Sequence, residues 1–189
     1  MKKSTAIFLL VVALVSCHNN EDFIETLPSC TNDTIFTHFP IDMDYVISFE
    51  PLGHYNPPGH VFPTDHHYFN IRRGEGNVDI FAPCDGWITT VFEYAAQGEL
   101  QREYAFEIYA CREVWVKYGH ISRLEDFILD ELGEPDLEDT YTTGGVTYHT
   151  KNFKTEIKVE AGQKIGRLLD IEYVSGMDFG TFDLRQKLP

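Results

Sequence analysis

The chain has 189 residues, of which 43% are hydrophobic and 14% are aromatic. This length and composition suit one domain with a sizeable core and are too small for two. The formal net charge is -15 and no basic stripe is present, which argues against a nucleic-acid partner, because phosphate backbones are bound by clustered Lys and Arg.

The N-terminal residues resemble a bacterial lipoprotein signal. Lys2 and Lys3 form a positive region, residues 6–15 form an apolar core too short to span a bilayer as a mature helix, and residues 14–17 end a small-residue cleavage site at Cys17. The resemblance implies cleavage before Cys17, acylation of Cys17, and export with lipid anchoring at the outer membrane or cell surface. The alternative is a plain secretory signal with an incidental cysteine.

A polar and acidic segment follows, with little periodicity up to about residue 37. Such a composition is typical of a linker. We therefore expect a signal peptide over residues 1–16, a lipid-anchored tether over residues 17–37 and a single domain over residues 38–189.

Short stretches of β-branched, aromatic and alternating residues dominate this domain. They predict strands over residues 45–49, from Pro63 to Ile71, and over 78–82, 87–94, 104–110, 114–120, 157–159, 164–170 and 179–184. Many short strands predict a mainly β sandwich or barrel. A further hairpin or ordered loop is expected over residues 137–153, around Gly144 and Gly145.

One helix is predicted among these strands. Ser122 is placed to cap it and Glu125 to complete a capping box, while Leu124 and Ile128 belong to its apolar face and Gly133 ends it.

The stretch Gly59–Ile71 concentrates histidines. Three of the chain's eight histidines and one aspartate lie within it, namely His60, Asp65, His66 and His67. Side chains alternate along a strand, so His66 and Asn70 are expected on one face and His67 on the other.

Three segments in order resemble the M23 metallopeptidases, also called LytM or lysostaphin-like endopeptidases. They are residues 78–91 with Ala-Pro-Cys-Asp-Gly, residues 118–122 with Tyr-Gly-His-Ile-Ser, and residues 159–166 with Val-Glu-Ala-Gly-Gln-Lys-Ile-Gly. The resemblance covers residues 54–184, apart from an insertion at about 123–155. It implies an M23-like β fold with a duplicated hairpin motif, one inserted helix, and a role at peptidoglycan.

The zinc site of that family carries over only in part. The resemblance makes His66 the one retained metal ligand and His120 the catalytic histidine, while Asn70 replaces a ligating carboxylate. Phe179 and Thr181 stand where the two late histidines are expected. Because catalytic zinc needs three protein ligands and an open position, we expect a domain that binds no cofactor and is inactive as an enzyme.

The leading functional hypothesis is therefore a binding or regulatory module of the cell envelope. Its partners would be the membrane, through the lipid, and peptidoglycan, another glycan or an envelope protein. The candidate binding residues are His60, Asp65, His66, His67, Asn70 and His120.

Two other readings remain. A rebuilt zinc site, with the histidines joined by Asp178 or Asp183, would make a metal-dependent peptidoglycan endopeptidase. In the other, the histidines only orient a loop.

The cysteines other than Cys17 are three, so at most one pair is bridged. In an exported protein a bridge between Cys84 and Cys111 is our expectation, with Cys30 left over. The alternative is that all three are reduced.

Overall fold

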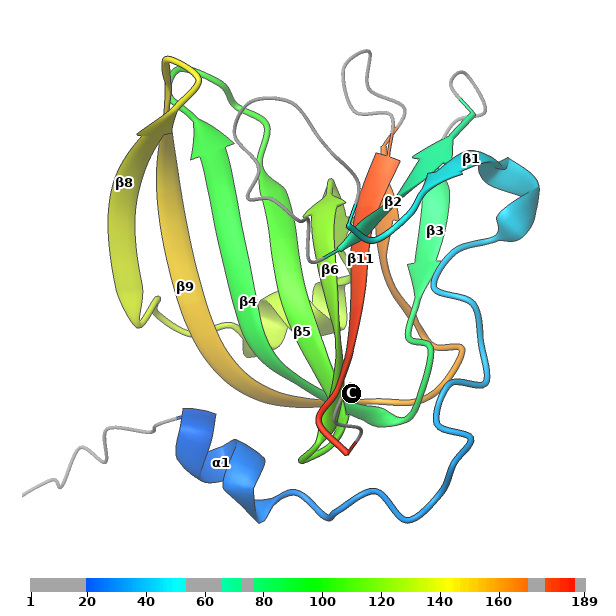
Figure 1. Cartoon of the computed structure of the whole chain (residues 1–189). Coiled ribbons are helices and arrows are strands. Elements are labelled where there is room, and N and C mark those ends of the chain that lie inside the picture. The colour runs from blue at the N-terminus through cyan, green and yellow to red at the C-terminus, as the bar shows by residue number, and fades with distance from the viewer. Residues whose placement is uncertain (1–19, 54–65, 73–76, 170–175, 186–189) are drawn as a thin grey trace, which may run out of the picture.

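The computed structural model describes residues 20–53, 66–72, 77–169 and 176–185 (Figure 1). Cys17, His60 and Asp65 lie outside the described residues. Among those described, no helix is both long and apolar enough to cross a membrane.

The described elements are mainly strands. They are α1 (Asn20–Thr26), η1 (Met43–Tyr45), β1 (Val46–Glu50), β2 (His67–Ile71), β3 (Val78–Phe81), β4 (Gly86–Ala96), β5 (Glu103–Cys111), β6 (Val114–Ile121), β7 (Arg123–Leu124), α2 (Asp126–Glu131), β8 (Leu137–Thr143), β9 (Val146–Val159), β10 (Lys164–Leu168) and β11 (Gly176–Asp183). The prediction of a mainly β, antiparallel fold is confirmed.

The strands form two antiparallel sheets. The larger has the order β1-β2-β11-β6-β5-β4-β9-β8, and the smaller has the order β3-β10-β7. β11 is therefore inserted between β2 and β6, although it is the last strand in the chain (Figure 1). This insertion positions the candidate site.

Two of the segments that carry the family resemblance, residues 78–91 and 159–166, lie side by side. β3 and β4 are joined by a tight turn but belong to different sheets, and the same holds for β9 and β10. Across the two segments, β3 pairs with β10 and β4 pairs with β9. Ala82 N donates to Gln163 O at 2.9 Å, and Gly162 N donates to Ala82 O at 2.8 Å, so the two turns are also bonded to each other. Each segment thus supplies the pairing strands of the other in both sheets.

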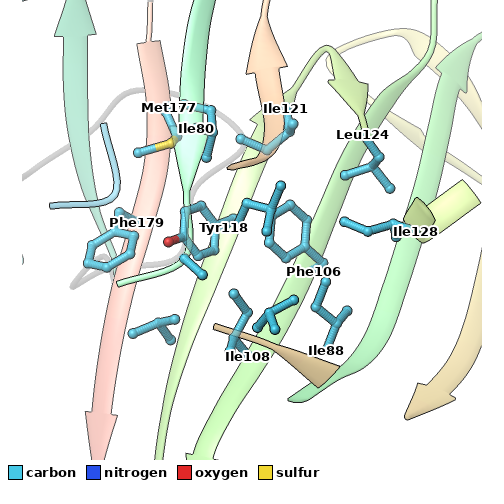
Figure 2. Packing of buried hydrophobic residues seen from close by; sticks show 14 of the residues in the cluster. Ile80, Ile88, Phe106, Ile108, Tyr118, Ile121, Leu124, Ile128, Met177 and Phe179 are labelled. Carbon is cyan, nitrogen blue, oxygen red and sulfur yellow. The ribbon is translucent and has the colours of Figure 1, made fainter. Parts of the chain in front are cut away.

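The core lies between the two sheets and contains a ring stack (Figure 2). Tyr118 is fully buried and lies parallel to Phe106, with ring centroids 4.7 Å apart. Its hydroxyl donates to Phe81 O at 2.8 Å, which satisfies the buried polar group. Ile128 of α2 is also fully buried and closes one end of this core.

The predicted capping box is wrong. Residues 123–124 form β7, and α2 begins only at Asp126, with Glu125 at its N-cap making no side-chain capping bond. Ser122 Oγ instead accepts from Leu169 N at 3.1 Å, and the Glu125 carboxylate pairs with Arg167 at 2.9 Å. Both side chains of the predicted capping box are therefore bonded to residues distant in the sequence and do not cap the helix.

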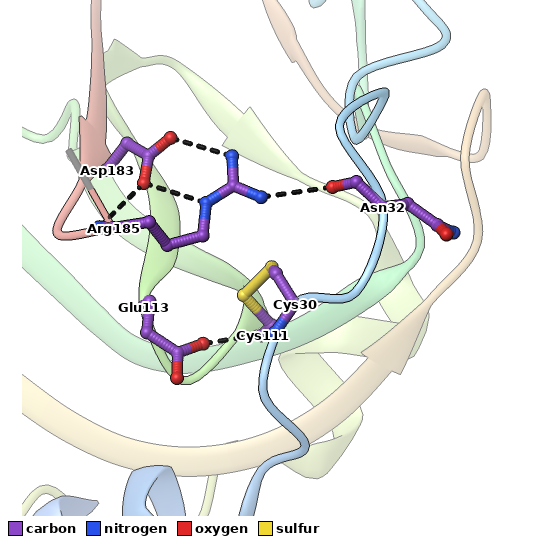
Figure 3. Close-up of polar contacts among 6 residues, drawn as sticks. All are labelled: Cys30, Asn32, Cys111, Glu113, Asp183 and Arg185. Carbon is purple, nitrogen blue, oxygen red and sulfur yellow. Dashed lines mark hydrogen bonds and ion pairs between the residues drawn. A yellow bond between two sulfur atoms is a disulfide. The ribbon is translucent and has the colours of Figure 1, made fainter.

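The predicted Cys84–Cys111 bridge is also wrong. Cys111, at the end of β5, forms its disulfide with Cys30, with their Cα atoms 5.4 Å apart (Figure 3). Cys84 is free and only 2% exposed, and burial together with the charge of Asp85 raises the pKa of its thiol to about 12. It is therefore an inert core residue.

Candidate functional site

Two histidines distant in the sequence approach the same carboxylate. His66 immediately precedes β2, His120 lies near the end of β6, and Asp178 lies on β11 between them. The Nε2 atoms of His66 and His120 are 3.6 and 3.5 Å from Asp178 Oδ2. The structure thus joins the two histidines that the sequence singled out, with Asp178 as the link.

His120 is held from its other ring nitrogen by β4 and β5. Its Nδ1 is 2.8 Å from Glu103 Oε2 and 3.2 Å from the Tyr94 hydroxyl. Burial opposes the charge on His120, but the hydrogen bond with Glu103 and the charges of Asp178 and Glu103 outweigh it and raise the His120 pKa. For Glu103, burial is likewise outweighed by its bonds with His120 and Tyr94, so the pKa of its carboxyl is lowered.

The backbone at His120 is in the left-handed region. Its φ is 59°, and it is the only residue other than glycine with a positive φ in the described part of the chain. Such a conformation costs about 1 kcal/mol or more for a residue with a Cβ and is often found at functional sites. It turns the imidazole towards Glu103 and Asp178.

A cavity of about 410 Å³ opens beside this cluster. Its lining comprises His66, Thr90, Phe92, Tyr94, Ala105, Phe106, Glu107, Lys117, Gly119, Asn152 and Asp178. The rings of Phe92 and Tyr94 are therefore in the lining together with carboxylates, an amine and an amide, whereas the ring of Phe106 is packed in the core against Tyr118. Mixed linings of this kind are typical of sites that bind small molecules or peptides.

Polar groups in the lining are partly desolvated. Burial raises the pKa of Glu107, although the charge of Lys117 acts in the opposite direction. Within the described residues, the buried Oδ1 atom of Asn152 has no hydrogen-bond partner. A ligand with an N–H group would satisfy that acceptor.

His67 and Asn70 do not join the cluster. As the strand alternation predicted, His67 lies on the opposite face to His66, where its ring contacts those of Phe49 and Phe179. Burial and the charge of His66 lower its pKa. The amide of Asn70 donates to Ser48 Oγ at 3.1 Å and to Glu50 Oε1 at 3.3 Å, and so belongs to the pairing with β1.

The late positions taken from the family resemblance lie elsewhere. Phe179 is 8% exposed and packs against Tyr118, with ring centroids 5.1 Å apart, so it faces the core. Thr181 is exposed. Asp178 is the residue of this strand that faces the cluster, whereas Asp183 lies at the far end of β11 and pairs with Arg185.

Glu103 was not recognised from the sequence as a site residue. The hairpin of β5 and β6 was predicted, but it contains a register shift between Tyr104 and Phe106. That irregularity brings Glu103 to the His120 ring. No local sequence signal marks such a shift.

The described residues do not form a ready zinc site. Only Cys30, Cys111 and Glu113 place three ligand atoms within 4.8 Å of one another, so His66, Asp178 and His120 do not. The two cysteines of that trio are linked to each other by a disulfide and cannot serve as thiolates. We therefore derive no zinc chemistry from this arrangement.

The opposite end of the same sheet face carries stacked rings. Tyr109, Trp115 and Phe182 occupy paired positions on β5, β6 and β11, and their rings are nearly parallel, at interplanar angles of 9° and 6°. Because the rings cover one another, Trp115 is not free to stack on a sugar.

No family model, curated protein or solved structure matches this chain.

Proposed function

We propose that the chain is a lipid-anchored protein of the cell envelope whose domain binds a peptidoglycan fragment without cleaving it. The observation that carries this proposal is the cavity lined by His66 and Asp178, with His120 next to it at 3.5 Å from the same Asp178 carboxylate. The lipid anchor rests on the signal that ends at Cys17.

The chemistry of the lining suits a glycopeptide. Phe92 and Tyr94 offer apolar surface to sugar rings and aliphatic groups, whereas the carboxylates of Glu107 and Asp178 suit ammonium and amide N–H groups. Lys117 and the imidazole of His66 can bind the carboxylates of the peptide stem. Peptidoglycan contains all of these groups.

The pairing of the duplicated turns supports an M23-like origin for the domain. The resemblance in residues 78–91 and 159–166 falls on strands that pair with one another. We infer that the scaffold was kept while the ligand set was lost, because Asn70 is bonded to Ser48 and Phe179 packs against Tyr118, so neither joins the His66–Asp178 pair.

Retention on purified sacculi tests the proposal. The wild-type protein should sediment with sacculi, and a His66→Ala, His120→Ala double variant should lose at least about tenfold in affinity, because about 1.4 kcal/mol corresponds to that factor. His149→Ala is the matched control, since His149 is exposed on β9 outside the cavity. Equal retention of all three proteins would contradict the proposal.

A metal-dependent endopeptidase with an altered ligand set is the second candidate. The approach of two imidazole Nε2 atoms to the same oxygen of Asp178 is the observation that favours it, although the three groups would have to move closer together to hold one ion. Elemental analysis of protein purified without a polyhistidine tag tests it. About one zinc per chain, lost in His66→Ala or His120→Ala, would favour the hydrolase.

A further inference from the structure

The segment expected to be a free tether is instead fastened along the domain. Leu27 is 5% exposed, and Cys30 is covalently linked to Cys111 (Figure 3). Hydrogen bonds continue on either side of that disulfide: Arg112 N donates to Pro28 O at 3.1 Å, Cys30 N to Glu113 Oε2 at 3.1 Å, Arg185 Nη1 to Asn32 O at 3.0 Å and Thr37 N to Pro83 O at 2.9 Å.

The helix before this segment also lies on the domain. α1 packs against β4 and β9, with Phe23 and Ile24 half-buried and Glu21, Asp22 and Glu25 exposed (Figure 1). The described chain is thus attached to the domain from its first turn of helix onward. Little slack remains between the proposed lipid and the folded protein.

The helix α1 and the disulfide both contact one end of the large sheet, which we call the anchor pole. It comprises α1, the disulfide and the cross-strand row of Trp87, Tyr109, Trp115 and Phe182. Asp178 lies four residues from Phe182 along β11, a separation of about 13 Å at the usual rise of a strand. The candidate site is therefore displaced from the anchor pole.

We propose that the anchor pole faces the bilayer at short range, so that the domain stands on the membrane with its binding cavity directed away from the lipid. Three peptide units join Cys17 to Asn20, and they span at most about 11 Å. This inference rests on the proposed acylation of Cys17.

The negative charge of the anchor pole bears on whether the pole adsorbs to the lipid surface or is only held near it by the acyl chains. Glu21, Asp22 and Glu25 are exposed on α1, and the whole chain carries a net charge of -15. An anionic lipid surface repels such a pole, so proximity comes from the acyl chains and the short connection rather than from adsorption. The anchor pole therefore lies close to the bilayer surface but does not insert into it.

The chain's only two tryptophans provide the probe, because Trp87 and Trp115 both lie at the anchor pole. Full-length lipoprotein is reconstituted into phosphatidylcholine vesicles that carry dansyl-labelled headgroups, and energy transfer from tryptophan to dansyl is measured. One variant carries a spacer of 20 Gly and Ser residues between Asn19 and Asn20, which adds about 25 Å on average. The matched control carries the same spacer between Gly144 and Gly145, in the β8–β9 turn.

The inference predicts strong transfer in the wild type and in the turn control, and at least a twofold loss with the N-terminal spacer. Mass spectrometry of Cys17 separates two failures. If Cys17 carries no lipid, the proposed anchor and this inference both fall. If Cys17 is acylated but the three proteins transfer equally, the anchor stands, the segment is a free tether, and this inference alone is overturned.

Discussion

Gly119 and Asp178 face each other across β6 and β11 so closely that a Cβ on residue 119 would lie 2.9 Å from Asp178 Oδ2. The carboxylate that links the two histidines therefore owes its position to the missing side chain of its neighbour. The sequence of β6 at this point, Gly-His, supplies both the space for Asp178 and one of its partners.

Substituting Gly119 should consequently disturb the site. Gly119→Ala should displace Asp178, lower retention on sacculi at least about tenfold and destabilise the fold by about 1 to 3 kcal/mol, as expected for overpacking. Gly133→Ala is the control, because no atom lies within 4 Å of a Cβ built there. Sedimentation and urea unfolding give the two values, and normal retention in Gly119→Ala would refute the role of Asp178.

The pairing of His120 with Glu103 should make stability depend on pH. The pKa of His120 is raised, so its stabilising contribution is complete below the ordinary histidine value of about 6.5 and is lost as the pH rises through the raised value. The pKa of Glu103 is lowered, so the carboxylate persists in acid until the pH falls through that value. The pair is strongest in the window between the two.

Glu103→Gln should therefore cost about 1 kcal/mol of unfolding free energy near pH 5.5 and less near pH 8.5. The figure is at the low end for a charged hydrogen bond, because the His120 side chain is 42% exposed. Urea unfolding at both pH values measures the difference. Glu138→Gln serves as the control, since the partner of Glu138 is Lys151 rather than a histidine.

The disulfide assignment predicts a specific peptide map. After alkylation in denaturant without reductant, the peptide of Cys84 should carry the label, and the peptides of Cys30 and Cys111 should be found linked. A linked Cys84 peptide would contradict the assignment.

Removing the bridge should also be costly. Cys30→Ala with Cys111→Ala should lower the unfolding free energy by about 2 to 4 kcal/mol, because the bridge closes a long loop in the unfolded chain. Urea unfolding of the double variant against the wild type measures the loss. A change below about 0.5 kcal/mol would show that the N-terminal segment adds little to the fold.

The stack of Tyr109 on Trp115 should be energetically coupled. Their ring centroids are 5.3 Å apart, and a double-mutant cycle to Ala should give a coupling of about 1 kcal/mol. The Tyr109→Ala variant should still bind sacculi as the wild type does, because the stacked rings of Tyr109, Trp115 and Phe182 lie outside the cavity lining. Loss of sacculus binding in a folded Tyr109→Ala variant would place glycan recognition at these stacked rings instead.

Local pattern was a good guide to the strands and to the faces of the histidine stretch. Alternation with period two put His66 and His67 on opposite faces, and the structure confirms this, since His66 meets Asp178 whereas His67 packs on Phe179. The turn at Gly144 and Gly145 was likewise found, because both residues have a positive φ that glycine adopts without strain.

Predictions from local sequence pattern were wrong where a side chain bonds to a residue distant in the sequence. Ser122 has the sequence of a helix cap, yet its hydroxyl accepts from Leu169 N, and Glu125 pairs with Arg167. The bridge of Cys111 could not be deduced from spacing either, because it depends on Cys30 lying against the end of β5.

The sequence by itself determined the mainly β class and the hairpins, and it singled out His66 and His120 as candidates, since these follow from side-chain alternation, turn residues and residue type. Only the tertiary structure decided that β11 enters the sheet between β2 and β6. That choice depends on pairing between strands at opposite ends of the chain, which no local pattern encodes. It is what places Asp178 between the two imidazoles and Phe179 in the core.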